Sequence, residues 1–238
     1  MKTIKHLIFG TLLVLASTSC IDRFVIEGNR IVNSEERDLV SFSKVKSSGN
    51  FEVYITHGDT PEVIVEAEQT ILPYIETTVS GNILHIDIQG WNTVINHRPM
   101  KVFVTTSALE GVQLSGSGFI EAEYFETGDI DLFVSGSGSI STAVSAGFVE
   151  ARVSGSGKIT VSGDAGDTRF NISGSGNIYA NNLACENCQA FISGSGNMRV
   201  FAVETLRADI SGSGNVYYKG NPEVDYHVSG SGKVIREN

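Results

Sequence analysis

The chain has few prolines, few basic residues and no helical periodicity. It contains four prolines among 238 residues, and apolar residues do not recur at the three- and four-residue spacing of an amphipathic helix, which excludes a mainly helical protein. Lysine and arginine number 17 against 27 acidic residues, a formal net charge of −10. This balance excludes nucleic acid and anionic membrane surfaces as partners, because both attract positive charge. What remains is an almost entirely β chain.

Long apolar runs are also missing, apart from one at the N-terminus. Lys2 and Lys5 precede the apolar run 7–15, and small residues then lead to Cys20. This pattern predicts a secretory signal peptide over residues 1–20, which is too short to span a bilayer as a mature helix. The cysteine after small residues resembles a bacterial lipoprotein signal, in which Cys20 becomes the lipidated N-terminus. Ordinary cleavage with an incidental Cys20 is the alternative.

Removal of this leader has consequences for charge and location. It takes away two lysines and no acidic residue, so 15 basic residues would face 27 acidic ones, a net charge of −12. We expect an exported protein, held in the cell envelope and at the outer membrane, with either face of that membrane possible. Membrane contact is expected only through the N-terminal lipid.

The most regular feature is the tetrapeptide Ser-Gly-Ser-Gly, which recurs seven times at steps of 18 to 20 residues. The copies begin at Ser115, Ser135, Ser154, Ser173, Ser193, Ser211 and Ser229. A branched apolar residue precedes every copy, and the position two places earlier is mostly apolar, whereas the position between them is mostly polar. This alternation is typical of a half-buried strand. Each repeat therefore predicts a strand, a tight turn, a strand and a looser return.

Seven such copies predict stacked coils that pair in parallel, the arrangement of a β-solenoid. The turn glycines fit it, because a reversal within four residues requires positive φ angles that glycine adopts without strain. The glycines assigned to the turns are Gly116, Gly118, Gly136, Gly138, Gly155, Gly157, Gly174, Gly176, Gly194, Gly196, Gly212, Gly214, Gly230 and Gly232. After the last glycine, Asn177, Asn197 and Asn215 occupy one column, which predicts a stabilising amide ladder.

The region before the repeats is β-rich but less regular. Residues 21–40 are mixed and charged, which predicts a tether and an irregular lead-in, whereas residues 41–110 carry strand patterns separated by turn signals. Ser48-Gly49-Asn50 looks like a degenerate copy of the later turn. We predict one domain over residues 41–238, in which the irregular part 41–110 caps the open end of the regular coils 111–238. A separate N-terminal domain is the alternative.

A family resemblance follows from these motifs. The lipoprotein-like leader, the strands 51–55 and 62–68 and the Ser-Gly-Ser-Gly turns resemble the head GIN domain family of putative auto-transporter adhesins, common in Bacteroidetes. The similarity covers roughly residues 38–235. It implies a right-handed parallel β-helix of pectin-lyase-like appearance without established catalytic residues. It also implies a role in cell adhesion, which for the family is itself an inference from structure.

Carboxylates on neighbouring coils raise the alternative of a polysaccharide-active enzyme. Asp131 and Glu150 share a column, but Arg169, Gln189 and Arg207 continue it, so the pattern favours a charge-compensated ladder with Glu150 paired to Arg169. The histidines are scattered, and no histidine or lysine column accompanies the turn serines. No Gly-Lys-Ser or Gly-Lys-Thr element follows a turn to make a phosphate site. We predict no catalysis, cofactor or metal.

Two cysteines lie close together in Cys185-Glu186-Asn187-Cys188. In an exported protein they could form a disulfide, but Cys188 falls in an inward column, so buried free thiols are the competing interpretation. A zinc site would need about four ligands, and a redox dithiol would need a strand-to-helix context that this sequence lacks.

The candidate binding residues lie on outward columns. Tyr179, Arg199 and Tyr217 fall on consecutive coils, about 4.8 Å apart, where they could contact a glycan or a protein, or serve only as ladder residues. Trp91, in the loop 90–99, is a further candidate. Phe133 and Phe191 lie in a nominally outward column and could mark a contact between subunits of a homo-oligomer or cover by another segment of the chain. We predict a non-enzymatic, adhesin-like lipoprotein; a purely structural or envelope-sensing lipoprotein is the other alternative.

Overall fold

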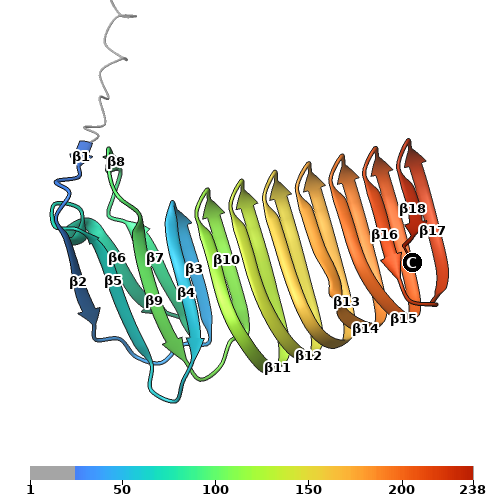
Figure 1. Cartoon of the computed structure of the whole chain (residues 1–238), viewed down its shortest axis with the longest axis horizontal. Coiled ribbons are helices and arrows are strands. Elements are labelled where there is room, and N and C mark those ends of the chain that lie inside the picture. Colours follow the sequence, from blue (N-terminus) through green and yellow to red (C-terminus); the bar gives the residue numbers. More distant parts are fainter. Residues whose placement is uncertain (1–24, 238) are drawn as a thin grey trace, which may run out of the picture.

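The computed structural model describes residues 25–237. Their strands form a row of coils that extends from a less regular N-terminal part to the C-terminus (Figure 1). The predictions of a signal peptide over residues 1–20 and of lipidation at Cys20 lie outside the described residues. Within the described part, no helix has the length and apolar character needed to cross a bilayer.

Each regular coil is dominated by one long strand that follows the chain from one turn to the next. The long strands are β11 (Phe119–Gly136), β12 (Ser139–Gly155), β13 (Lys158–Gly174), β14 (Asn177–Gly194) and β15 (Asn197–Gly212), and the shorter β10 (Gly111–Gly116) precedes them. All neighbours pair in parallel, and the register places each Ser-Gly-Ser-Gly copy beside the next, for example Ser135 beside Ser154. The predicted parallel β-solenoid is therefore confirmed.

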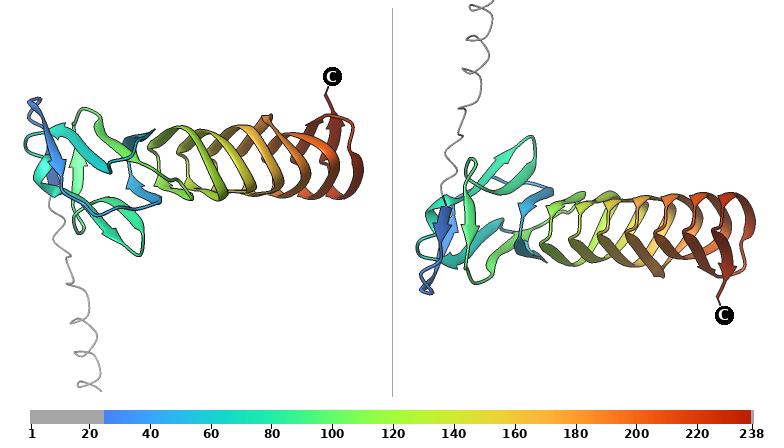
Figure 2. Two further views of the ribbon diagram at one scale, coloured as in Figure 1. Left: turned by 90° about the horizontal axis from the view of Figure 1, so that it is seen from below. Right: turned by 90° about the horizontal axis from the view of Figure 1, so that it is seen from above.

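The return after each turn differs from the looser segment that the sequence predicts. It is extended as well, and it pairs with the neighbouring coils, interrupted by register shifts such as the one between Glu121 and Tyr124. Figure 2 shows that these coils stack along one axis.

The core follows from the period-two alternation of the strands. After each turn, the second residue beyond the last glycine points inward, and Ile120, Ile140, Ile159 and Ile178 are all at most 1% exposed. They stack in register on consecutive coils. These columns belong to one apolar cluster of buried residues, which runs from Ile26 to Val216. Burial of a branched side chain of this kind contributes about 1.5–3 kcal/mol, so the inward columns hold the coils together.

The turn glycines fall into two classes. The first glycine of each of the seven copies has a φ between +114° and +133°, where a side chain would be strained, as predicted. The second glycine has no positive φ, so the prediction is wrong for this class. Its constraint is space: a Cβ on Gly196 would lie 2.1 Å from the carbonyl oxygen of Gly176 on the preceding coil.

Most of the N-terminal part continues the same sheet, whereas the strands Val25–Glu27 and Thr93–Ile95 form a separate two-stranded parallel sheet. Its elements are β1 (Val25–Glu27), β2 (Val32–Arg37), β3 (Lys44–Gly49), β4 (Phe51–His57), β5 (Glu62–Glu68), the short 3₁₀ helix η1 (Leu72–Tyr74), β6 (Ile75–Ser80), β7 (Ile83–Ile88), β8 (Thr93–Ile95) and β9 (Met100–Thr106). β3 pairs in parallel with β10 and aligns Gly49 with Gly116. Gly49 also has a φ of +109°, so the degenerate turn copy at residues 48–50 is confirmed.

Antiparallel strands distinguish this part from the coils. β2 pairs with β5, β5 with β9 and β6 with β7, all antiparallel. The expectation of an irregular lead-in up to residue 40 is thus wrong for residues 32–37, because β2 pairs along its whole length with β5. The buried carboxylate of Glu68 secures the surrounding loops by accepting hydrogen bonds from the backbone N–H groups of Arg98, at 2.6 Å, and Arg30. The bond from Arg98 is the main cause that lowers the pKa of Glu68.

The solenoid ends in a coil made of shorter strands. β16 (Asn215–Lys219) and β17 (Glu223–Gly230) pair with β15, and β18 (Lys233–Arg236) pairs with β16. In residues 25–237 no further strand pairs with the outer edges of β17 and β18.

Candidate functional site

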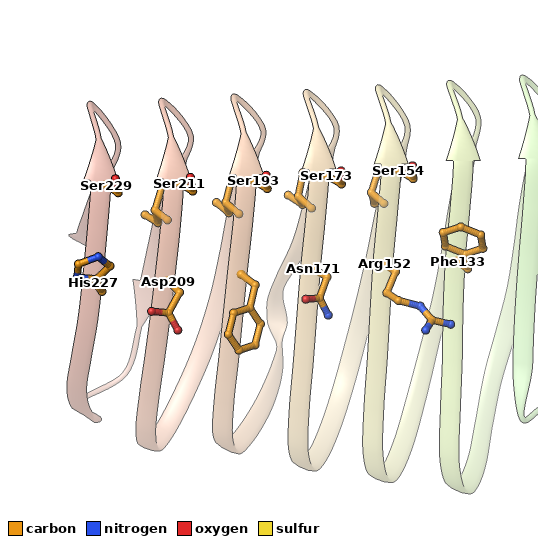
Figure 3. A pocket seen from close by; sticks show the side chains of 15 residues that line it. Phe133, Arg152, Ser154, Asn171, Ser173, Ser193, Asp209, Ser211, His227 and Ser229 are labelled. Carbon is orange, nitrogen blue, oxygen red and sulfur yellow. The ribbon is translucent and has the colours of Figure 1, made fainter.

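A groove of about 650 Å³ runs across the coils on the face that precedes the turns. Most of its lining comes from two outward columns, because residues two apart in a strand point to the same face, and the intervening residues Val153, Ile172, Ile192 and Ile210 complete it. One column contains Phe133, Arg152, Asn171, Phe191, Asp209 and His227, and the other contains the turn serines Ser154, Ser173, Ser193, Ser211 and Ser229. Figure 3 shows these side chains in two rows that cross successive coils.

Arg152 lies at the end of the groove that contains Phe133. Its guanidinium lies 5.5 Å from the centre of the Phe133 ring and donates a 2.7 Å hydrogen bond to the Asp131 carboxylate. A second guanidinium nitrogen is 3.8 Å from a Glu150 oxygen. Burial raises the pKa of Asp131, and the nearby Arg152 charge opposes this shift. The groove therefore presents a cation that is already paired and fixed in orientation.

This arrangement bears on the carboxylates that the sequence raised as enzyme candidates. The structure brings Asp131 and Glu150 together on adjacent coils, and Arg152 bridges them. The predicted ion pair of Glu150 with Arg169 is wrong: these residues are register partners, but Glu150 approaches Arg152, and Arg169 donates to Gln189 at 3.4 Å. Among residues 25–237, no three His, Cys, Asp or Glu side chains are placed to hold a metal ion.

The column Tyr179, Arg199 and Tyr217 lies on the other face, after the turns. The three residues are register partners, as the sequence predicts. The Arg199 guanidinium lies 4.7 Å from the centre of the Tyr217 ring and forms an ion pair with Glu237. Arg199 is therefore engaged within the chain. Trp91 is 71% exposed and lies in the N-terminal part, between β7 and β8, so it does not join this column.

The asparagines of the same face form the predicted ladder. The backbone N–H of Asn197 donates to the side-chain oxygen of Asn177 at 3.2 Å. Asn215 repeats this bond to Asn197 at 3.2 Å and adds a side-chain bond at 3.1 Å. These groups satisfy one another, which supports a structural role.

Cys185 and Cys188 are both buried free thiols in the structure, which is the second of the two interpretations left open by the sequence. Thr168 donates to the Cys185 sulfur at 3.4 Å, and the Cys185 thiol donates to the Phe201 carbonyl at 3.3 Å. The hydrogen bond from Cys188 lowers the pKa of Cys185, and the same bond, together with burial, raises the pKa of Cys188. The pair packs inside the coil and contributes nothing to the surface.

The groove itself is the feature that sequence reasoning missed. Phe133 and Phe191 are visible in the sequence as large apolar residues in an otherwise polar outward column, and that signal could have found it. The alignment could not show that Arg152 belongs to the groove, because its contacts connect residues of two coils and of two alignment columns.

Comparison with known proteins places the chain in a family. The family model described as "Putative auto-transporter adhesin, head GIN domain" matches residues 41–222. The chain belongs to this family. No curated protein matches the chain.

Solved structures share the fold of this head GIN domain protein. A "putative adhesin" from Bacteroides fragilis is 22% identical with a TM-score of 0.83, over 89% of this chain and 100% of that one. A "putative lipid binding protein" from Parabacteroides distasonis is 22% identical with a TM-score of 0.76, over 90% and 100%. A "putative adhesin" from the same species is 25% identical with a TM-score of 0.73, again over 90% and 100%.

Proposed function

We propose that this protein is a non-enzymatic binding protein of the bacterial cell envelope that holds a neutral glycan chain in the groove between Phe133 and Phe191. The observation that carries the proposal is the groove itself, with two aromatic rings and a row of hydroxyl groups on one face. Coils recur about every 4.8 Å, close to the length of one sugar residue along an extended chain. Successive sugars can therefore meet equivalent groups on successive coils.

The side chains suit sugar recognition. The faces of Phe133 and Phe191 offer apolar surfaces for the C–H side of a sugar ring. Between them, Asn171 can donate and accept hydrogen bonds, and the turn serines can do both through their hydroxyls. These groups are carried by paired strands rather than by loops. The protein therefore loses little conformational entropy when a ligand binds.

The charges of the groove favour a neutral ligand. Arg152 is already paired with Asp131 at 2.7 Å, and Asp209 is within 3.2 Å of Arg207, so the arginine of the groove is not free to attract an acidic sugar. The pairing of Asp131 and Glu150 with Arg152 argues against either of them as a general acid, because that role needs a carboxyl group free to hold and release a proton. Envelope location is supported by the family and by the expected signal over residues 1–20.

The test compares two faces of the same protein. Neutral and acidic glycans are screened on an array, and affinities for the best one are measured by calorimetry for the parent, for Phe133→Ala with Phe191→Ala, and for Tyr179→Ala with Tyr217→Ala. We expect the Phe pair of substitutions to weaken binding at least about tenfold, or 1.4 kcal/mol. The Tyr pair is the control and should bind as the parent does.

Other outcomes would assign the protein differently. Loss of binding in the Tyr double variant or in Trp91→Ala, with the Phe double variant unaffected, would move the site to that surface. Release of shortened sugars from the glycan would favour the polysaccharide-active enzyme. Binding of a fatty acid or of an envelope protein in the groove, with no glycan bound, would refute the glycan assignment.

A further inference from the structure

The last coil exposes apolar side chains that the preceding coils bury. Leu206 and Ile210 of β15 are 1% and 2% exposed, whereas their register partners Val224 and Val228 in β17 are only partly buried. The contrast is greatest at Tyr226, which is 61% exposed although its partner Ala208 is fully buried. Because no strand of residues 25–237 covers this end, the outer edge of β17 also presents unpaired backbone groups, a template for another strand.

We propose that this end docks against the same end of a second copy of this chain, with β17 paired antiparallel to β17 of the partner about a two-fold axis at Tyr226. The sequence of β17 is complementary to itself in this register. Asp225 falls opposite His227 twice, Val224 falls opposite Val228 twice, and Tyr226 faces its own copy. Directly opposed residues in antiparallel strands point to the same face, so the valines extend the core and the Asp225–His227 pairs stay outside.

The other side of the coil is compatible with the same axis. The turn serines Ser211 and Ser229 are 18 residues apart, so an axis through the coil at Tyr226 leaves it half a coil later, at Ile235. There Ile235 of β18 faces its own copy. Contact of one surface with itself closes a dimer rather than a filament. This inference does not rest on the glycan assignment, although His227 also lines the groove.

Cross-linking tests the register. Tyr226→Cys is made in a Cys20→Ser background, and Cys185 and Cys188 are already buried. Mild oxidation with copper phenanthroline should join two copies of Tyr226→Cys through the introduced thiols, because opposed Cα atoms in antiparallel strands are about 4.5–5.5 Å apart. Tyr124→Cys, at a residue that is 48% exposed on β11, is the matched control and should stay monomeric on a denaturing gel. Equal cross-linking of both variants, or none of Tyr226→Cys, would overturn the proposal.

A charge exchange tests the pairing without cysteine. His227→Asp places two carboxylates opposite each other and should raise the dimer dissociation constant at least about tenfold in analytical ultracentrifugation. Adding Asp225→His exchanges the two residues and should restore dimerisation to near that of the parent, which a general loss of folding could not do. A parent chain that remains monomeric at about 0.1 mM, or an exchange that restores nothing, would refute the two-fold contact.

Discussion

Four glycines separate the two constraints found at the turns, and substitution by alanine measures each one. Gly128 has neither constraint, since its φ is ordinary and a Cβ would meet nothing within 4 Å. Gly90 has a φ of +64° in open space. Gly196 has no positive φ, but a Cβ there would lie 2.1 Å from the carbonyl oxygen of Gly176 and 2.7 Å from the Cγ2 methyl of Ile172. Gly194 combines a φ of +132° with a carbonyl at 2.2 Å from a Cβ.

The expected costs follow from these values. Gly128→Ala should be neutral or should stabilise by up to about 1 kcal/mol, because it restricts the unfolded chain. Gly90→Ala should cost about 1–2 kcal/mol for the left-handed backbone. Gly196→Ala should cost about 1–3 kcal/mol, because the neighbouring carbonyl is backbone held in the sheet and the coils must move apart. Gly194→Ala carries both penalties and should cost roughly 3–5 kcal/mol.

Urea unfolding, monitored by circular dichroism, gives these free energies of unfolding. In a thermal scan with a single transition, the melting temperature should fall by about 2–4 °C for each kcal/mol. The decisive comparison is Gly196→Ala against Gly128→Ala. Equal stability of those two variants would mean that the coils yield without cost, and the explanation of the second turn glycine would be wrong. Gly232 in the last coil meets the Gly214 carbonyl at 2.2 Å, so Gly232→Ala should cost as much as Gly196→Ala.

Three further predictions concern polar and sulfur groups. Asn197→Ala removes an acceptor used by the next coil and should lower the free energy of unfolding by about 1 kcal/mol in the same urea titration. Cys185 and Cys188 should resist Ellman's reagent in the native protein and both react in urea; rapid native labelling would contradict their burial. Because the pKa of Glu68 is lowered on folding, its contribution is present above the unfolded pKa, about 4.3, and is lost as pH falls. The melting temperatures of Glu68→Gln and the parent should therefore converge in acid, and a constant difference would refute this account.

Much of the solenoid can be predicted from the sequence because every coil repeats the same alternation of inward and outward residues around the same turn. The inward column represented by Ile140 and Ile159, and the asparagine ladder, follow from aligning the copies alone. The copy at residues 48–50 is recognisable for the same reason, although only one glycine of the pair remains there. Parallel in-register stacking converts a column in an alignment directly into a ladder in space.

The parts that could not be predicted depend on contacts that do not repeat. The pairing of β2 with β5 joins two segments without a shared motif, and nothing local in the charged stretch 32–37 marks it as a strand. Likewise, Glu150 and Arg169 are correct register partners, yet Glu150 turns toward Arg152, because a long guanidinium side chain reaches past one column to the next. Register limits which residues are neighbours, but side-chain length decides which neighbours bond.

The division of labour within each coil has an evolutionary consequence. The inward residues and turn glycines fix the spacing of the stack, whereas the outward positions of the groove face solvent on a frame that does not depend on their identity. Exchange of an outward residue can therefore alter what the surface recognises at little cost to folding. Duplication of one whole coil would lengthen the groove by one rung while every new contact copied an existing one. In such a protein, the chemistry of the groove surface and the length of the groove can therefore change separately.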